Sequence, residues 1–353
     1  MKILITGGNG FIGSAVIRNI LDHGEHNIIN LDDLTYSSSL DSLSGYDKSK
    51  NYYFEKVNIC NERIIKNIFI KHQPDRIMHF AAETHVDRSI DSSINFINTN
   101  ILGTYNLLEQ SRFYYSSLKD KKKKNFLFHH ISTDEVFGDL GVNEQPFTEN
   151  SSYRPSSPYA ASKASSDHIV RAWHRTYKLP IIISNCSNNY GPYQFPEKFI
   201  PHTILNALNG RSIPIYGNGL QIRDWLYVED HARALLEVLF KGKNGETYNI
   251  GGNNEKKNID VAFKICEILD NLVKKKPSNI KKFQELIVFV NDRPGHDSRY
   301  AINSSKINNQ LNWFPKETFD SGILKTVTWY LDNREWWNKI LSGEYKLERI
   351  GKE

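Results

Sequence analysis

Two stretches near the middle of the chain hold residues whose types could perform acid–base chemistry. In the first, a hydroxyl and two acids, Thr133, Asp134 and Glu135, follow the apolar run Phe126–Ser132. Polar and charged groups at the end of a buried strand are costly unless water or a ligand contacts them. These three side chains are therefore candidates for catalysis.

The second stretch is Pro158-Tyr-Ala-Ala-Ser-Lys, which opens a predicted helix. Tyr159 and Lys163 are four positions apart, so their side chains share one helical face. An ammonium group beside a phenol favours the phenolate and is expected to lower the pKa of Tyr159. Such a tyrosine can act as the general base that removes a proton from an alcohol. The pair alone is a weak motif. It becomes informative because it follows, along the chain, βα units that begin with a predicted nucleotide cradle.

That cradle is predicted at the N-terminus, where Gly7, Gly10 and Gly13 stand between a short apolar strand at Ile3–Thr6 and a helix. A strand, a glycine turn and a helix N-terminus form the usual binding site for the pyrophosphate of a dinucleotide. Glycines also mark plain turns, but here they lie in the required strand-to-helix context. The stretch therefore predicts a bound dinucleotide.

An acid follows the second predicted strand, Asn27–Asp32. Asp32 lies 32 − 13 = 19 positions beyond Gly13, close to the roughly 20 expected of the residue that binds the adenosine ribose. A carboxylate there accepts hydrogen bonds from both ribose hydroxyls and repels a 2′-phosphate, so the sequence favours NAD over NADP. Asp33 is the second candidate, and either residue could instead cap the next segment.

Alternating strands and helices must position these residues. Strands are expected at 3–6, 27–32, 52–57, 76–82, 126–132 and 180–185, and helices at 14–21, 62–71, 93–116 and from 158 onward. This order predicts an α/β fold with a doubly wound parallel, Rossmann-type sheet, whose ligands bind beyond the carboxyl ends of the strands. The denser turns that follow predict a smaller mixed α/β substrate lobe, with helices expected near 198–209, 230–240, 259–274 and 319–332.

We therefore expect an NAD-binding domain at 1–187, with returns near 228–252 and 315–335, and a mainly substrate-binding domain at 188–353. Four segments between or after the main elements are expected to lack regular structure. Glu83–Ser89 and Lys119–Lys124 are expected to be loops, Asn188–Tyr193 a turn-rich exit, and Gly343–Glu353 an extended tail.

In a regular strand, Asp134 and Glu135 would face opposite sides of the sheet. Both can reach one substrate only if the backbone leaves β geometry at Thr133, so we predict a turn there. A helix N-cap followed by acids in its first turn would explain the same triplet without catalysis.

Composition narrows the classes of protein. The net charge of +5 is small for 353 residues, and the lysine-rich run is not interleaved with aromatics, so no nucleic-acid partner is expected. The three cysteines have neither metal-site nor disulfide spacing, which predicts no metal site and fits the cytoplasm. Met1 leads directly into the first strand, so no signal peptide is expected. No apolar run approaches membrane-spanning length, so no membrane span is expected.

Several further motifs carry a resemblance to a known family. They are Ser132-Thr-Asp-Glu-Val-Phe-Gly, Asn188-Asn-Tyr-Gly-Pro, Pro196-Glu-Lys, Arg223-Asp-Trp and Asp292-Arg-Pro-Gly-His-Asp-Ser-Arg-Tyr. Together with the glycine turn and the Tyr159–Lys163 pair, they resemble the dTDP-glucose 4,6-dehydratase family of the extended short-chain dehydrogenase/reductase superfamily. The resemblance extends from Met1 to about Trp337.

The resemblance implies a lyase that moves a hydride from C4 to C6 of dTDP-glucose through NAD and removes water across C5–C6. It implies that Tyr159 is the base at the 4-hydroxyl, that Lys163 supports it, and that Thr133 binds the C4 oxygen. Glu135 then removes the C5 proton, and Asp134 protonates the departing 6-hydroxyl. A deoxysugar pathway, such as that to rhamnose, follows from the same resemblance.

The binding residues implied by the cradle, the strand ends and the family form two sets. The cofactor set is Gly7, Gly10, Phe11, Ile12, Gly13, Asp32, Asn58, Ile59, Ala81, Tyr159 and Lys163. The substrate set is Thr84, His85, Thr133, Asn188, Lys198, Arg223, Arg293 and His296. The family also pairs the helices near 93–116 and 159–177 across a homodimer.

Departures from the family pattern and two rival functions stay open. Asn58 stands where the family usually has an acid, and Ser37–Ser39 replace a small-Gly-Asn run, so the adenosine contacts are less certain. A UDP-glucose dehydratase, epimerase or decarboxylase would keep the same cofactor and substrate class, and nothing in the sequence separates thymine from uracil. A non-catalytic NAD-binding regulator is the alternative of another class.

Overall fold

The computed structural model describes residues 1–24, 26–277, 280–343 and 347. Its largest element is a seven-stranded sheet in which every pair of neighbouring strands is parallel, in the order β10-β6-β5-β4-β1-β2-β3. The strands are β1 (Lys2–Thr6), β2 (Asn27–Asp32), β3 (Tyr52–Lys56), β4 (Arg76–His79), β5 (Leu127–Thr133), β6 (Ile181–Cys186) and β10 (Thr247–Ile250). The predicted doubly wound, Rossmann-type fold is confirmed.

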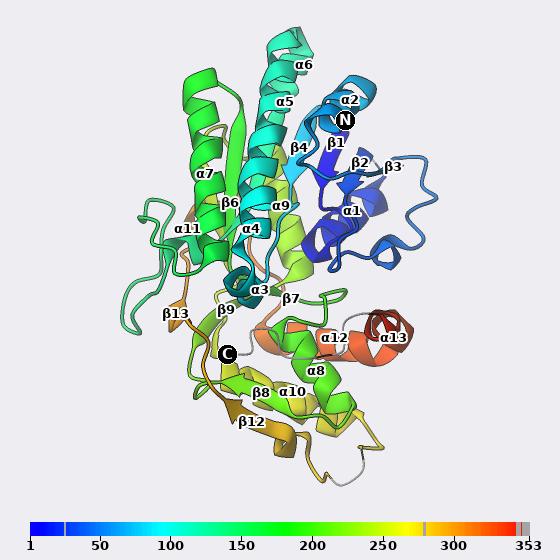
Figure 1. Cartoon of the computed structure of the whole chain (residues 1–353), viewed down its shortest axis with the longest axis vertical. Coiled ribbons are helices and arrows are strands. Elements are labelled where there is room, and N and C mark those ends of the chain that lie inside the picture. The colour runs from blue at the N-terminus through cyan, green and yellow to red at the C-terminus, as the bar shows by residue number, and fades with distance from the viewer. Residues whose placement is uncertain (25, 278–279, 344–346, 348–353) are drawn as a thin grey trace.

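Helices cover both faces of this sheet because its strands are apolar on both sides (Figure 1). One face packs against α2 (Glu62–His72), α5 (Thr104–Ser117) and α7 (Pro158–Tyr177), and the other against α1 (Phe11–His23), α9 (Val228–Lys241) and α11 (Ser305–Leu311). Neighbouring residues of one strand serve opposite faces: Leu4 packs beneath the first group and Ile5 beneath the second.

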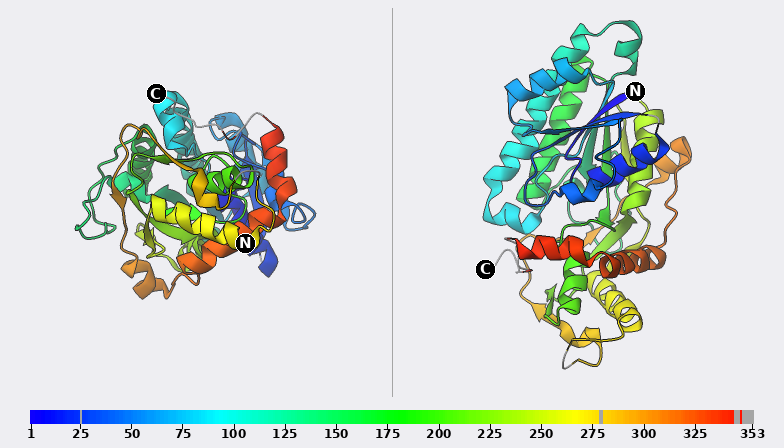
Figure 2. Two further views of the ribbon diagram at one scale, coloured as in Figure 1. Left: turned by 90° about the horizontal axis from the view of Figure 1, so that it is seen from below. Right: turned by 90° about the vertical axis from the view of Figure 1, so that its right-hand side faces the viewer.

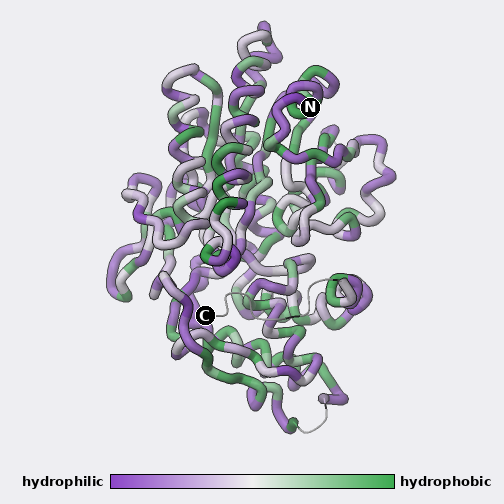
Figure 3. Tube along the Cα trace, in the orientation of Figure 1, coloured by the Kyte–Doolittle hydropathy of each residue, from purple (hydrophilic) through white to green (hydrophobic). Residues whose placement is uncertain are grey.

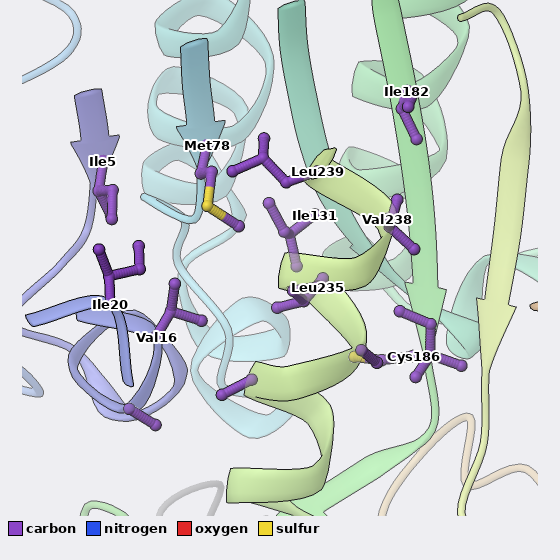
Figure 4. Close-up of a cluster of buried hydrophobic side chains, with 14 of the residues drawn as sticks. Ile5, Val16, Ile20, Met78, Ile131, Ile182, Cys186, Leu235, Val238 and Leu239 are labelled. Carbon is purple, nitrogen blue, oxygen red and sulfur yellow. The ribbon is translucent and has the colours of Figure 1, made fainter. Parts of the chain in front are cut away.

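The second of these cores is drawn in Figure 4, where apolar side chains of α1 and α9 meet those of the strands. The labelled residues are Ile5, Val16, Ile20, Met78, Ile131, Ile182, Cys186, Leu235, Val238 and Leu239. Burial of each large aliphatic side chain contributes roughly 1.5–3 kcal/mol to folding. This core fixes α1, and therefore the glycine turn that precedes it, against the sheet.

A smaller group of elements lies at one end of the sheet (Figures 1 and 2). Its four-stranded sheet is formed by β7 (Asn188–Tyr190), β9 (Ile222–Tyr227), β11 (Glu255–Lys257) and β13 (Arg299–Tyr300), and a two-stranded sheet by β8 (Ile213–Tyr216) and β12 (Ile287–Val290). The helices are α8 (Phe199–Leu208), α10 (Asn258–Leu272), α12 (Phe319–Asp332) and α13 (Arg334–Ser342), with a 3-10 turn at Phe283–Leu286. They share a separate hydrophobic core.

The hydropathy of the chain matches this arrangement (Figure 3). Hydrophobic stretches lie along the strands and on inward helix faces, and hydrophilic stretches gather in the loops. Among the described residues, no helix is both long and apolar enough to cross a membrane.

Three segments differ from the sequence-based expectations. The loop expected at Glu83–Ser89 overlaps α3 (Val86–Asp91), and the loop expected at Lys119–Lys124 overlaps α6 (Asp120–Asn125). Both helices have an acid in the first turn and a base in the last, which complements the helix dipole. The turn-rich exit after β6 begins with β7.

The long helix expected at 93–116 is also divided, into α4 (Ser93–Phe96), a π-helical turn at Ile97–Gly103 and α5. The 3-10 turn at Leu40–Leu43, α11 and α13 had no counterpart among the expected elements. Most of the extended tail expected at Gly343–Glu353 lies outside the described residues.

Candidate active site

A cavity of about 430 Å³ lies where the parallel strands end, and it begins at the glycine turn after β1. Gly7 has φ of +73°, a conformation that side chains with a Cβ rarely adopt, and a Cβ there would lie 2.7 Å from the amide nitrogen of Ala81. A Cβ on Gly13 would collide with the carbonyl oxygen of Gly7. These two glycines are therefore required by the protein's own packing.

Gly10 is different, because a Cβ there would meet only the Gly7 oxygen, at 3.2 Å. Gly10 lines the cavity at the N-cap of α1, where backbone N–H groups and the helix dipole favour a negatively charged group. A glycine that the fold itself does not require leaves space for a ligand. This cradle fits the pyrophosphate of a dinucleotide.

The acid at the end of β2 lies on the same wall. Asp32 accepts hydrogen bonds from the backbone N–H groups of Asn9 (2.9 Å) and Leu34 (2.8 Å), and burial raises the pKa of its carboxyl. The Ser38 side chain is a third hydrogen-bonding neighbour of this carboxyl. A carboxylate has about four acceptor positions, so Asp32 can still accept a hydrogen bond from a ribose hydroxyl. Asp33 is held by the side-chain amide of Asn58 at 2.7 Å.

The backbone leaves β geometry immediately after Thr133, as predicted. A 3-10 turn spans Asp134–Phe137, and the Thr133 hydroxyl accepts a hydrogen bond from the Glu135 N–H at 3.3 Å. The N-cap arrangement considered above is thus present as well. Because of this turn, both carboxyl side chains line the cavity that Tyr159 also lines.

The two carboxyl groups differ in their electrostatic surroundings. Burial, followed by the charge of Glu135, raises the pKa of Asp134 well above its usual value. Burial also raises the pKa of Glu135, but Arg293 and then Arg223 oppose that rise. Among the described residues, Asp134 Oδ2 has no hydrogen-bond partner. Asp134 is thus suited to donate a proton and Glu135 to accept one.

Tyr159 and Lys163 both lie in the first half of α7 and are buried. The Lys163 ammonium donates a hydrogen bond to the carbonyl oxygen of Ile131 at 2.8 Å. The expected lowering of the Tyr159 pKa is wrong for the protein alone. Burial and then the charge of Glu135 raise the pKa of Tyr159 well above its usual value. Burial removes the water that would stabilise a phenolate.

A second cavity, of about 220 Å³, adjoins the first on the side of the smaller group of elements. Arg223 donates hydrogen bonds to the carbonyl oxygens of Ile222 and Asp297, both at 2.8 Å. Arg293 donates to Asp87 at 3.0 Å, while its buried Nε has no partner among the described residues. A buried guanidinium N–H without a partner is suited to an oxyanion.

His296 also lines this second cavity. Its Nδ1 lies 2.6 Å from Asp292 Oδ1, and burial, followed by the charge of Arg293, lowers its pKa to about 4. The imidazole is therefore neutral near pH 7 and can serve as a hydrogen-bonding group.

Two residues of this cavity were missed in the sequence analysis. Asp87 accepts hydrogen bonds from Arg293 and from the Tyr216 hydroxyl, the latter at 2.9 Å, and so joins α3 to the smaller group of elements. Asp87 lies two positions after His85, so the motif around His85 could have indicated it as a site residue. Tyr216 lies in a strand without any motif, so the sequence did not indicate it.

Glu197 was also missed, although its motif was recognised. Its carboxylate accepts hydrogen bonds from the Tyr36 hydroxyl and from Arg88 Nε, both at 3.0 Å. The Arg88 guanidinium also lies 4.0 Å from the centre of the Tyr36 ring. Together they link the segment after β2, helix α3 and the segment before α8, which meet around the larger cavity.

The structure brings every predicted site residue to one of the two cavities. The larger is lined by the whole cofactor set together with Thr133, Asp134 and Glu135, and the smaller by His85, Arg223, Arg293 and His296. Four predicted residues line both: Thr84, Glu135, Asn188 and Lys198. A dinucleotide cradle and a cationic cavity thus share one acid–base centre.

The sheet, the glycine turn and the Tyr159–Lys163 pair define a Rossmann-type protein of the short-chain dehydrogenase/reductase class. Residues 4–326 match the family model described as GDP-mannose 4,6 dehydratase, and the chain belongs to this family. It is 59% identical to a dTDP-glucose 4,6-dehydratase of Escherichia coli, with 99% of each chain covered. The resemblance found in the sequence is confirmed.

Two solved structures extend the comparison. A dTDP-glucose 4,6-dehydratase from Bacillus anthracis in complex with NAD has a TM-score of 0.84 and 44% identity, covering 96% of this chain and 99% of that one. A dTDP-glucose 4,6-dehydratase from Streptomyces venezuelae with NAD and TYD bound has a TM-score of 0.86 and 38% identity, covering 96% and 100%.

The glycines give a test of the cradle. In Gly10→Ala the methyl group lies 3.2 Å from the Gly7 carbonyl oxygen, which must shift only slightly, so the free energy of unfolding of the ligand-free protein should change by no more than about 1 kcal/mol. The same methyl group occupies ligand space, and NAD affinity should fall about tenfold or more. Calorimetric titration with NAD and thermal unfolding measure the two effects.

Gly13→Ala is the matched comparison. Its Cβ collides with the Gly7 carbonyl, so both stability and NAD affinity should fall. Wild-type NAD affinity in Gly10→Ala would contradict the assignment of this turn to the cofactor.

Proposed function

We propose that this chain is an NAD-dependent hydro-lyase that converts dTDP-glucose to dTDP-4-keto-6-deoxyglucose. The observation that carries the proposal is the meeting of two unlike carboxyl groups, Asp134 and Glu135, with Tyr159 at the end of a dinucleotide cradle. The activity for which the relatives are named, including the Escherichia coli enzyme, supports the same reaction.

The cofactor would be held by the glycine turn, by Asp32 at the ribose, and by Tyr159 and Lys163 near the reacting end. When bound, its nicotinamide supplies an acceptor for the C4 hydride and returns that hydride to C6. The protein's part is to move protons and to keep water out. We assign the cofactor mainly to 1–187 and the sugar nucleotide mainly to 188–353.

Tyr159 takes the proton of the 4-hydroxyl, and the Thr133 hydroxyl hydrogen-bonds the same oxygen. The 4-keto group that results acidifies C5–H. Glu135 removes the C5 proton, and Asp134 gives a proton to the leaving 6-hydroxyl, so one water departs. A proton then returns to C5, which leaves the 4-keto-6-deoxy sugar.

The proposed reaction requires two carboxyl groups that differ in protonation state. Asp134 must be protonated when the hydroxyl leaves, and burial with Glu135 beside it favours that form. Glu135 must be ionised, and the guanidinium of Arg293 favours that form. Two acids in identical surroundings would compete for one role.

The sugar nucleotide would occupy the smaller cavity. Arg223 and Arg293 are assigned to the diphosphate because guanidinium groups match phosphate oxygens. Asn188 and His296 are assigned to the diphosphate or nucleoside, and Lys198 lies between the two cavities. Thr84 and His85, on the segment after β4, are assigned to the sugar side.

We also propose a homodimer through the outer side of α3–α5 and α7. Large apolar side chains are exposed along it, namely Ile90, Ile94, Ile97, Leu102, Tyr105, Phe113 and Tyr177. Tyr105 and Trp173 tie the two helices together with ring centres 5.7 Å apart. A row of this length is unusual on a monomer surface.

The unbridged cysteines support a reducing, cytoplasmic setting.

Parallel incubation with dTDP-glucose and UDP-glucose tests the reaction and the base. We expect the alkali-absorbing 4-keto-6-deoxy product from dTDP-glucose, with kcat/KM about tenfold or more above that for UDP-glucose. Equal turnover would contradict dTDP-glucose as the preferred substrate, and a 4-epimer would indicate an epimerase. Tight NAD binding with no product from either sugar would favour the non-catalytic regulator.

Solvent exchange separates the two acids. In deuterium oxide, Asp134→Asn should still let Glu135 remove the C5 proton, so recovered dTDP-glucose gains deuterium at C5 while product formation falls about 100-fold or more. Glu135→Gln should lose both exchange and product. Mass spectrometry of recovered substrate and product reads out both results, and normal product formation by Asp134→Asn would remove its role as the acid.

Sedimentation velocity tests the dimer. Leu102→Asp puts a charge on the proposed interface and should weaken dimerisation about tenfold or more, because the charge would be buried unpaired. Leu324→Asp on α12, whose leucine is similarly exposed, is the control and should leave the dimer intact. A wild-type monomer at all concentrations would refute the proposal.

A further inference from the structure

A fully buried carboxylate lies directly behind the acid–base centre but outside both cavities. Asp167 is on α7, one helical turn beyond Lys163, and is completely withdrawn from solvent. It lines neither cavity, so the reaction gives it no direct part. A buried charge is expensive unless something requires it.

The hydrogen bonds of Asp167 show which elements this carboxylate connects. One oxygen accepts hydrogen bonds from the Tyr153 hydroxyl at 2.8 Å and from the Ser132 hydroxyl at 3.0 Å, and the side-chain amide of Asn185 is 3.4 Å away. The other oxygen lies 3.2 Å from His130 Nε2. The carboxylate therefore joins α7 to strands β5 and β6.

Two of these partners reach the catalytic turn. Ser132 immediately precedes Thr133, and the Asn185 amide also donates to the Thr133 carbonyl oxygen at 3.0 Å. The last residues of β5 are thus fixed from α7 at the point where the backbone turns to place Asp134 and Glu135.

The charge of Asp167 also acts on Lys163. Burial lowers the pKa of the Lys163 ammonium, and Asp167 is the main group that opposes this. Among the described residues, no carboxylate forms a direct ion pair with Lys163, whose hydrogen bond goes to a backbone carbonyl.

The other titratable groups around Lys163 come from each neighbouring element. On β4 and β5, burial lowers the pKa of His79 well below its usual value and that of His130 to about 4, so both are neutral near pH 7. On β6, burial raises the pKa of Cys186, which stays a thiol, and on α7 that of Tyr159. Arg171 lies one helical turn beyond Asp167 on α7, and its charge helps to lower the pKa of the Asp167 carboxyl.

We propose that Asp167 is a positioning residue for the proposed dehydration: it places a negative charge one helical turn from Lys163 on α7, and its hydrogen bonds hold the end of β5 that presents Thr133, Asp134 and Glu135. The inference rests on the proposed function. It assigns a task to a residue that touches neither substrate nor cofactor.

Asp167→Asn in the full-length, NAD-loaded enzyme tests this, because it removes the charge and keeps the shape and one acceptor oxygen. We expect kcat for dTDP-glucose to fall roughly tenfold at neutral pH. The alkaline limb of the kcat profile should move to lower pH, since Lys163 loses its proton more easily. KM should stay within about twofold, because Asp167 lines neither cavity.

Two further variants separate charge from structure. Asp167→Glu keeps the charge and should lower thermal stability while the alkaline limb stays at its wild-type position. Asp230→Asn changes another buried carboxylate, which accepts hydrogen bonds from the N–H groups of Lys316 and Glu317 away from the site. It should reduce stability without moving the profile.

An active Asp167→Asn enzyme with an unmoved alkaline limb would overturn the inference. If that variant does not fold, a moved limb in Asp167→Glu would overturn it, because the charge is then present and packing alone has changed. Failure of the proposed function is distinguishable, because wild-type protein would then form no product at any pH.

Discussion

The site depends on one constraint: several ionisable groups are withdrawn from water together, so each sets the charge of the next. Burial alone would neutralise Asp134, Glu135 and Lys163 alike. The guanidinium of Arg293 favours an ionised Glu135, Glu135 in turn favours a protonated Asp134, and Asp167 favours a charged Lys163. Proton donors and acceptors are thus distinguished by their neighbours, although their side chains are chemically alike.

A change in backbone conformation after β5 brings these ionisable groups together. While β5 remains a strand, alternate residues face opposite sides of the sheet, and Ser132 points to the buried carboxylate of Asp167. The 3-10 turn at Asp134–Phe137 ends that alternation, so two adjacent acids reach one cavity. The parallel sheet places this turn at the same edge as the glycine turn after β1, with β4 between the two strands, because the carboxyl ends of all its strands meet at one edge.

Much of the fold and of the candidate site was predictable because local sequence patterns indicate them. The glycine spacing, Asp32 and the Tyr159–Lys163 pair each specify a local geometry, and the strand-end rule brings them together. The α3 helix was missed because its six residues are too few to show a helical periodicity, and the π-helical turn was missed because it lies inside a continuous helical pattern. The pKa of Tyr159 was predicted in the wrong direction because the sequence shows Lys163 nearby but not the depth of burial. Asp87 and Tyr216 meet only through the fold.

The overlap of the two cavities explains why the chemistry sits where it does. Glu135 lines both, whereas Asp32 and Gly10 line only the larger and Arg293 only the smaller. A cofactor in the glycine cradle and a diphosphate on the arginines would therefore converge on the segment that carries the acids. Arg293 has a double part in this geometry, because the guanidinium that would bind the diphosphate also favours the ionised form of Glu135. In the proposed function, substrate recognition and proton transfer would be electrostatically coupled through Arg293 and, to a smaller extent, through Arg223.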